Sequence, residues 1–130
     1  MDADKRATWV AALRSGKYKQ TQGLLRNSAD AMCCLGVAIN EFCASHWERY
    51  DGGWIDGTHA TSDDRDAMPS PDTLRLLGLT EPEASTLADL NDSFGLSFSE
   101  IANHIERNPD GLDGYFDDQD RERHGASNRT

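Results

Sequence analysis

The spacing of apolar residues predicts two helices in the first half of the chain. Trp9 and Leu13 lie one helical turn apart in a stretch that ends at Gly16, which predicts a helix over residues 3–15. After Cys34, apolar side chains recur on one helical face, so we expect this second helix to form the centre of the core. The residues on that face are Leu35, Ala38, Ile39, Phe42 and Cys43.

Three helix-start signals follow in the second half. Ser70 supplies a capping hydroxyl before a proline and an acid, and Gly78 marks the end of that helix. Thr80 and Ser97 are each followed three residues later by glutamate, which is the capping-box pattern. These signals predict helices between residues 70 and 78, over 81–91 and over 98–107.

Two hairpins are predicted, one before and one after the central helix. Residues 22–26 and the segment from Met32 onward read as short strands around a polar turn, and the second strand runs directly into the helix. Residues 47–56 hold aromatic segments joined by Asp-Gly-Gly, a turn sequence typical of hairpins. These aromatic side chains either floor a pocket or cover a small core.

The predicted fold class is α+β, with a small antiparallel sheet of two hairpins packed against the central helix and a C-terminal helical group. A chain of 130 residues with 37% hydrophobic content fits one compact domain, which we expect over residues 1–116, followed by a disordered polar tail at 117–130. No apolar run approaches the roughly 18 residues that cross a bilayer, and the N-terminus lacks the apolar core of a secretion signal. We expect a soluble, cytoplasmic protein.

Charge is distributed unevenly along the chain. Residues 1–26 carry six basic side chains against two aspartates, hence +4, and the total of −10 leaves −14 on the remainder. Such a field repels nucleic acid and attracts cationic protein grooves, although it also serves ordinary solubility. Residues 95–102 resemble the first helix of a helix-turn-helix. A helix-breaking turn sequence and several aspartates follow, however, in place of a basic recognition helix. We therefore expect no direct DNA reading.

The basic connector after the first helix is a candidate binding site for an anionic ligand or a partner. Its cationic side chains and single tyrosine suit phosphate or carboxylate groups, whereas the alternative is a solvated connector. A glycine inside the central helix indicates a close approach by a ligand or by another backbone segment. The residues assigned to this candidate site are Arg14, Lys17, Tyr18, Lys19, Arg26 and Gly36.

Cys33 and Cys34 lie where the predicted strand meets the helix. The positive end of a helix lowers a thiol pKa or holds an anion, so Cys34 as nucleophile with His104 as base would make a cysteine-dependent hydrolase or transferase. Apolar neighbours indicate instead buried structural thiols with raised pKa. An odd number of cysteines, two of them adjacent, argues against a disulfide framework, and their spacing to His46 lacks the pattern of a zinc site. We expect no metal and no cofactor.

Several segments resemble a group of small bacteriophage and prophage proteins that has no assigned activity. The similar residues cover about half of the chain, within 9–40 and 70–107, and Cys-Cys-Leu-Gly-Val is the most specific part. They are Trp9, Leu13-Arg14-Ser15-Gly16-Lys17-Tyr18, Gln20, Gly23, Leu25-Arg26, Cys33-Cys34-Leu35-Gly36-Val37, Leu87-Ala88, Leu90-Asn91-Asp92, Phe98, Glu100-Ile101-Ala102 and Ile105-Glu106. The resemblance implies a phage accessory protein that works in the bacterial cytoplasm, and it transfers no catalytic residue.

Three functional hypotheses follow. The leading one is an inhibitor that binds a host defence or regulatory factor stoichiometrically, either by presenting its acidic surface to a basic groove or by sequestering a small anionic ligand. The second is the cysteine-dependent enzyme. The third is a structural or interaction module.

Overall fold

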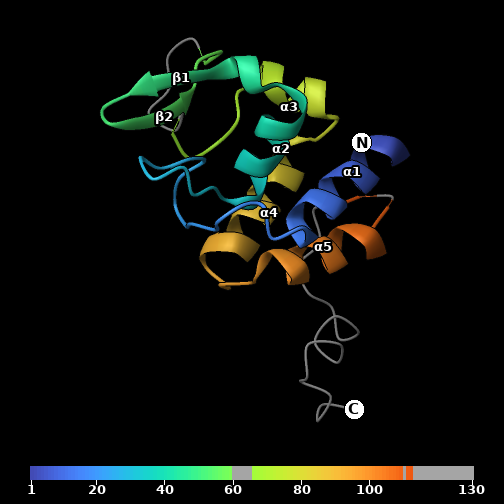
Figure 1. Ribbon diagram of the computed structural model, residues 1–130. Coiled ribbons are helices and arrows are strands. Elements are labelled where there is room, and N and C mark those ends of the chain that lie inside the picture. Colours follow the sequence, from blue (N-terminus) through green and yellow to red (C-terminus); the bar gives the residue numbers. More distant parts are fainter. Residues whose placement is uncertain (60–65, 110, 113–130) are drawn as a thin grey trace.

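In the part of the chain that the structure describes, five α-helices and one two-stranded antiparallel sheet form the fold (Figure 1), which confirms the α+β class. The computed structural model describes residues 1–59, 66–109 and 111–112, and the tail expected at 117–130 lies outside them. In chain order the elements are α1 (Ala3–Arg14), α2 (Cys34–Phe42), the 3-10 turn η1 (Ala44–His46), β1 (Trp47–Tyr50), β2 (Gly53–Asp56), α3 (Pro71–Leu77), α4 (Glu81–Asp92) and α5 (Phe98–Arg107).

The central position predicted for α2 is confirmed. It contacts α1, α3 and α4, while α1 packs along α5 on the side away from the hairpin (Figure 1). The first six residues of α2 are buried, and the indole Nε1 of Trp9 donates a hydrogen bond to the Cys34 carbonyl oxygen at 3.0 Å. One continuous apolar cluster therefore joins the helices. Within the described residues, no helix has the length and apolar character needed to span a bilayer.

The predicted caps are present at the three C-terminal helices. The Ser70 hydroxyl accepts from the Thr73 N–H, and both expected capping boxes form, at Thr80 and at Ser97. Gly78 ends α3 with φ of +79°, a left-handed conformation that favours glycine. Local signals therefore position these helix starts to within a residue or so.

The loop between α1 and α2 is fixed by the buried carboxamide of Asn91 in α4. Its Oδ1 accepts hydrogen bonds from Gln20 Nε2 at 2.8 Å and from the Cys34 backbone N–H at 3.3 Å. Its Nδ2 donates to the Thr21 carbonyl oxygen at 2.9 Å and to Asp92 Oδ1 at 2.8 Å. Because a carboxamide offers two donors and two acceptor lone pairs, this group is fully used. The loop, the start of α2 and the end of α4 are thus held together.

The first predicted hairpin is wrong. In place of paired strands the described residues show two isolated bridges, both to Met32, from Gln20 and Arg26. The Asn27 side chain accepts two backbone N–H groups of the following turn, at 2.9 and 3.0 Å, and α2 begins at Cys34. This local turn and the early helix start leave Met32 alone to pair, so no ladder extends from it.

The second predicted hairpin is confirmed. β1 and β2 pair in antiparallel register, with Arg49 opposite Trp54 and Tyr50 opposite Gly53. Asp51 and Gly52 form the turn with φ of +51° and +80°, the left-handed pair that a tight two-residue hairpin turn requires.

A buried carboxylate joins this hairpin to α3. Asp56 Oδ2 accepts from the Ser70 backbone N–H at 2.9 Å, and Oδ1 accepts from the Thr58 N–H at 3.0 Å and its hydroxyl at 2.6 Å. Burial would by itself raise the pKa of Asp56, but these hydrogen bonds together favour the carboxylate, and the net result is a lowered pKa. Since Ser70 caps α3, Asp56 fixes the base of the hairpin to the start of that helix.

Gly36 marks a contact between backbones. A Cβ at this position would lie 1.9 Å from the Leu25 carbonyl oxygen and 2.9 Å from its carbonyl carbon. The close approach expected at Gly36 therefore comes from the chain's own loop, and the assignment of Gly36 to a ligand site is wrong.

We predict that Gly36→Ala destabilises the fold even though alanine is the better helix former. Overpacking against a backbone carbonyl costs about 1–3 kcal/mol, more than the roughly 1 kcal/mol gained in helix propensity. Urea unfolding followed by circular dichroism measures the difference. Gly53→Ala is the matched control, because its added methyl would lie 3.7 Å from the nearest atom, the Arg26 carbonyl oxygen. Equal stability of Gly36→Ala and the parent chain would contradict the contact.

We predict an acid-sensitive contribution to stability from Asp56. A lowered folded-state pKa stabilises the protein fully above the unfolded-state pKa of about 4, and this contribution is lost as pH falls through the folded-state pKa. Asp56→Asn should lower the free energy of unfolding at neutral pH by roughly 1–3 kcal/mol, and the gap to the parent chain should narrow below about pH 4. Asp4→Asn removes an exposed carboxylate and serves as the control. If the difference in free energy of unfolding between Asp56→Asn and the parent chain stayed constant with pH, the lowered pKa of Asp56 would be refuted.

Candidate functional site

The basic residues expected to form one anion site lie apart, and Arg14, Lys17 and Arg26 pair with three different carboxylates. Arg14 Nη2 lies 2.8 Å from Glu106 Oε1 and 2.6 Å from Asn103 Oδ1, across the contact between α1 and α5. Its hydrogen bond with Glu106 raises the pKa of the guanidinium and lowers the pKa of the carboxyl group. Arg14 therefore joins two helices at the surface.

Lys17 and Tyr18 share one carboxylate. Lys17 Nζ lies 3.4 Å from Glu41 Oε2, and the Tyr18 hydroxyl donates to the same oxygen while accepting from Asn40 Nδ2 at 3.0 Å. Burial and then the bond to Glu41 raise the pKa of Tyr18. Lys19 is exposed, and its side chain has no hydrogen-bond or ion-pair partner among the described residues. The connector is thus not a single cationic cluster.

The N-terminus of α2 is closed by groups of the chain itself. The Cys34 N–H is already bonded to the Asn91 side chain, and Cys33, the N-cap residue, is buried. Gly36 in the first turn faces the Leu25 carbonyl. The chain's own groups occupy the positions that a ligand would need.

The structure does not join Cys34 and His104 into a nucleophile–base pair. Cys34 is 0% exposed, and its thiol has one hydrogen-bond partner among the described residues, the Leu87 carbonyl oxygen at 3.6 Å. Burial, followed by the neighbouring Cys33, raises the pKa of Cys34 well above its usual value. His104 lies buried in α5, with Nδ1 3.4 Å from Asn108 Nδ2. Burial also raises the pKa of Cys33 to about 11. Cys33 and Cys34 therefore match the interpretation as buried structural thiols.

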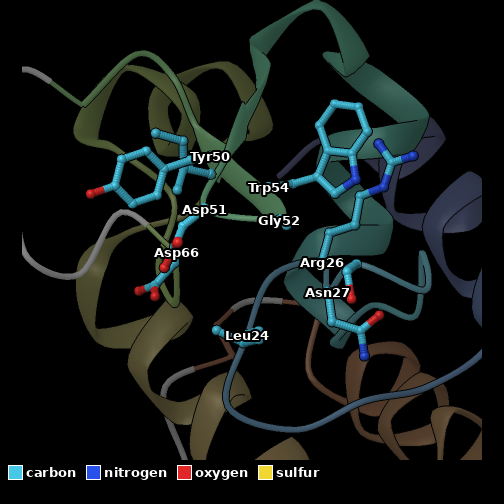
Figure 2. A pocket seen from close by; sticks show the side chains of 11 residues that line it. Leu24, Arg26, Asn27, Tyr50, Asp51, Gly52, Trp54 and Asp66 are labelled. Atoms are coloured by element: carbon cyan, nitrogen blue, oxygen red, sulfur yellow. The ribbon is translucent and has the colours of Figure 1, made fainter.

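A pocket of about 330 Å³ lies between the hairpin and the loop that follows α1 (Figure 2). Its volume is within the range of small-molecule and side-chain binding sites. Figure 2 shows Trp54 and Arg26 on one side and Tyr50 with two aspartates on the other. The lining residues are Leu24, Arg26, Asn27, Ser28, Tyr50, Asp51, Gly52, Gly53, Trp54, Ile55 and Asp66. The Asn91 network sets the course of this loop, and the Asp56 cluster sets the base of the hairpin.

Guanidinium groups stack on the indole of Trp54. The guanidinium carbon of Arg26 lies 3.9 Å from the Trp54 ring centroid, and that of Arg49 lies 4.8 Å from it. Trp47 meets the same indole edge-on with centroids 6.4 Å apart. The Trp54 Nε1 atom is buried and has no hydrogen-bond partner among the described residues. This wall of the pocket is an aromatic surface that already binds cations.

The unbalanced charge of the pocket is negative. Arg26 Nη2 lies 2.9 Å from Asp30 Oδ1, so its charge is paired within the loop. The carboxylates of Asp51 and Asp66 have no hydrogen-bond or ion-pair partner among the described residues, and Asp66 is half-buried. The pocket therefore combines aromatic walls with two unpaired carboxylates.

Sequence reasoning found part of this pocket. Arg26 was a candidate site residue, and a pocket floor was one of the two alternatives for the hairpin aromatics. The lining residues that were not predicted are Leu24, Asn27, Asp51 and Asp66. The pairing of Leu25 N–H with the Asp66 carbonyl oxygen at 2.7 Å brings the second aspartate to the loop. No local signal in the sequence indicates this contact, because the two residues are far apart along the chain.

A family described as "Domain of unknown function (DUF8296)" matches residues 1–75. The match includes α1, α2, the hairpin and every lining residue of the pocket, and it ends within α3. No curated protein and no solved structure matches the chain. Among the residues that the structure describes, no three histidine, cysteine, aspartate or glutamate side chains gather as a metal site would require.

We predict that the three thiols react slowly in the folded protein. All three are buried, and burial raises the pKa of each, so little reactive thiolate is present at neutral pH. Reaction with a chromogenic disulfide reagent at pH 7 should become fast only when urea unfolds the chain. Rapid modification of Cys34 in the native protein would contradict the predicted slow reaction and would support the hypothesis of a cysteine-dependent enzyme.

Proposed function

The chain belongs to the DUF8296 family, and we propose that it is a phage-encoded accessory protein that inhibits a host defence or regulatory factor by stoichiometric binding. One observation carries the proposal: the three thiols are buried, while tyrosine, tryptophan and arginine side chains line the hairpin pocket. These three residue types dominate the binding energy of protein interfaces. The bacterial cytoplasm as the place of action belongs to the same proposal.

The pairing of the basic residues favours the acidic-surface mode over capture of an anionic ligand. Arg14, Lys17 and Arg26 each contact a carboxylate of the chain, so an anion would have to displace an existing partner. The net charge of −10 instead draws the protein toward a cationic groove. We therefore propose a host protein with a basic binding surface as the partner.

Co-purification tests this proposal. The tagged chain, incubated with bacterial host lysate, should retain one partner in a fixed molar ratio at about 50 mM salt and release it near 500 mM, because salt screens charge attraction. Native mass spectrometry gives the ratio. Tyr50→Ala should weaken retention, whereas Leu76→Ala should not, although the two parent side chains are similarly exposed at 50% and 39%.

Two outcomes would refute the proposed function. Capture that is indifferent to salt would remove the electrostatic argument. Turnover of a compound by the purified chain, abolished by Cys34→Ser, would replace binding by catalysis.

A further inference from the structure

We infer that the outer edge of β1 receives an extended segment of the partner as a third strand, an inference that rests on the proposed function and specifies its contact. The outer edge consists of the backbone groups of Trp47, Arg49 and Asp51 that point away from β2. The hairpin projects from the helices, and β1 forms one side of its two-stranded sheet (Figure 1). The direction of these backbone groups, their lack of partners and the charges beside them carry the inference.

The hydrogen bonds of the hairpin show which groups of β1 point outward. In an antiparallel pair, directly opposite residues alternate between those that exchange hydrogen bonds and those that do not. The Gly57 N–H donates to the His46 carbonyl oxygen at 2.8 Å, and these two residues continue the register of β1 and β2 by one position. The bonded positions of β1 therefore recur at Glu48 and Tyr50. The residues between them direct their backbone groups away from β2.

Four backbone groups on the outer edge are open to a further strand. They are the Trp47 carbonyl, the Arg49 N–H and carbonyl, and the Asp51 N–H, which points outward because the carbonyl of the same peptide unit faces β2. The Trp47 N–H is excluded, because it donates to the Ala44 carbonyl oxygen. None of the four has a hydrogen-bond partner among the residues that the structure describes, and residues 48–51 are exposed. Such an edge pairs with an extended backbone, the mode called β-strand addition.

The side chains of β1 do not cover its outer edge. Long charged side chains often protect an edge strand, but here they lean across β2. The Arg49 guanidinium lies 4.8 Å from the ring centroid of Trp54, on β2, and Trp47 meets the same ring edge-on. The Glu48 carboxylate lies beside Gly57, where an added Cβ would be 2.8 Å from its Oε1. An incoming backbone therefore does not have to displace these side chains.

Charge favours a basic segment of the partner over a second copy of this chain. Two copies paired about Arg49, the register that uses all four groups, would set that arginine opposite its equivalent, and like charges opposite each other are destabilising. Two chains of net charge −10 also repel. A partner segment with basic residues opposite Glu48 and Asp51, and an acidic residue opposite Arg49, is complementary at all three positions. Such a segment is basic overall, as the proposed partner is.

A titration with synthetic peptides tests the inference. The probe is the acetylated and amidated peptide Thr-Lys-Val-Glu-Lys-Thr-Thr, which sets its lysines opposite Asp51 and Glu48 and its glutamate opposite Arg49. It is added to the full-length 15N-labelled chain, and amide shifts are followed by NMR. We expect saturable shifts at the Arg49 and Asp51 amides with affinity in the millimolar range. The charge-exchanged peptide Thr-Glu-Val-Lys-Glu-Thr-Thr should bind about tenfold more weakly.

Backbone methylation of the probe distinguishes strand addition from charge attraction alone. N-methylation of its glutamate removes the N–H that would donate to the Arg49 carbonyl, so binding should weaken about tenfold. N-methylation of its valine removes an N–H that would point to solvent, so the affinity should stay within about threefold of the unmodified probe. The two methylated peptides have the same charge and the same added group. Equal affinities would therefore overturn the inference.

Two substitutions at Arg49 separate the role of its backbone from that of its side chain. Arg49→Pro removes the outward N–H, which is not part of the β1–β2 ladder, and should weaken binding of the probe about tenfold. Arg49→Ala keeps the N–H and should bind within about threefold of the parent chain. The unfolding midpoint of each variant verifies that it is folded. If Arg49→Pro does not fold, the methylated peptides still decide the question on the parent chain.

The outcomes separate the inference from the proposed function. The absence of saturable shifts, shifts confined to another surface, or equal loss of binding in both Arg49 variants would overturn the inference. A dimer of the free chain whose Arg49 amide is protected from hydrogen exchange would also overturn it. If the probe does not bind while a host protein is still held stoichiometrically at low salt, the inference fails and the proposed function stands. If the probe binds as expected but no host protein is held, the proposed function fails.

Discussion

The arrangement of this protein depends on one buried side-chain amide, that of Asn91. An unpaired buried polar group costs about 1–3 kcal/mol, and here the partners come from the loop after α1, the start of α2 and the end of α4. With its ends tied in this way, the loop delivers the Leu25 carbonyl to Gly36 and Arg26 to the hairpin. The pocket on the hairpin side is thus a consequence of polar contacts made on the far side of the loop.

Much of the fold could be predicted because its signals are local. Hydroxyl caps at Ser70, Thr80 and Ser97, and the left-handed turn at Asp51 and Gly52, each act within four residues of sequence. The loop after α1 could not be predicted, because its strand-like pattern is overruled by hydrogen bonds to α4, about 70 residues away. Periodicity reports which residues are apolar but carries no information about such polar anchors.

The candidate site divides in the same way. Arg26 and the hairpin aromatics stand out in the sequence by type and spacing, and they do line one pocket. The thiol junction also stood out, yet the Cys34 N–H that would attract an anion is bonded to Asn91, and apolar packing covers the sulfur. Basic residues that are close in the sequence are paired with different carboxylates in the structure. Residue type identifies candidates, but pairing decides their role.

The indole nitrogen of Trp54 gives the pocket one more property. Its N–H is buried and meets no acceptor among the described residues, so the folded protein carries an unsatisfied hydrogen-bond donor on this side chain. A ligand with a main-chain oxygen that accepted a hydrogen bond from this atom would satisfy the donor in addition to making its other contacts. Binding that satisfied this donor would therefore stabilise the folded protein, and it would raise the melting temperature as well as contribute to affinity.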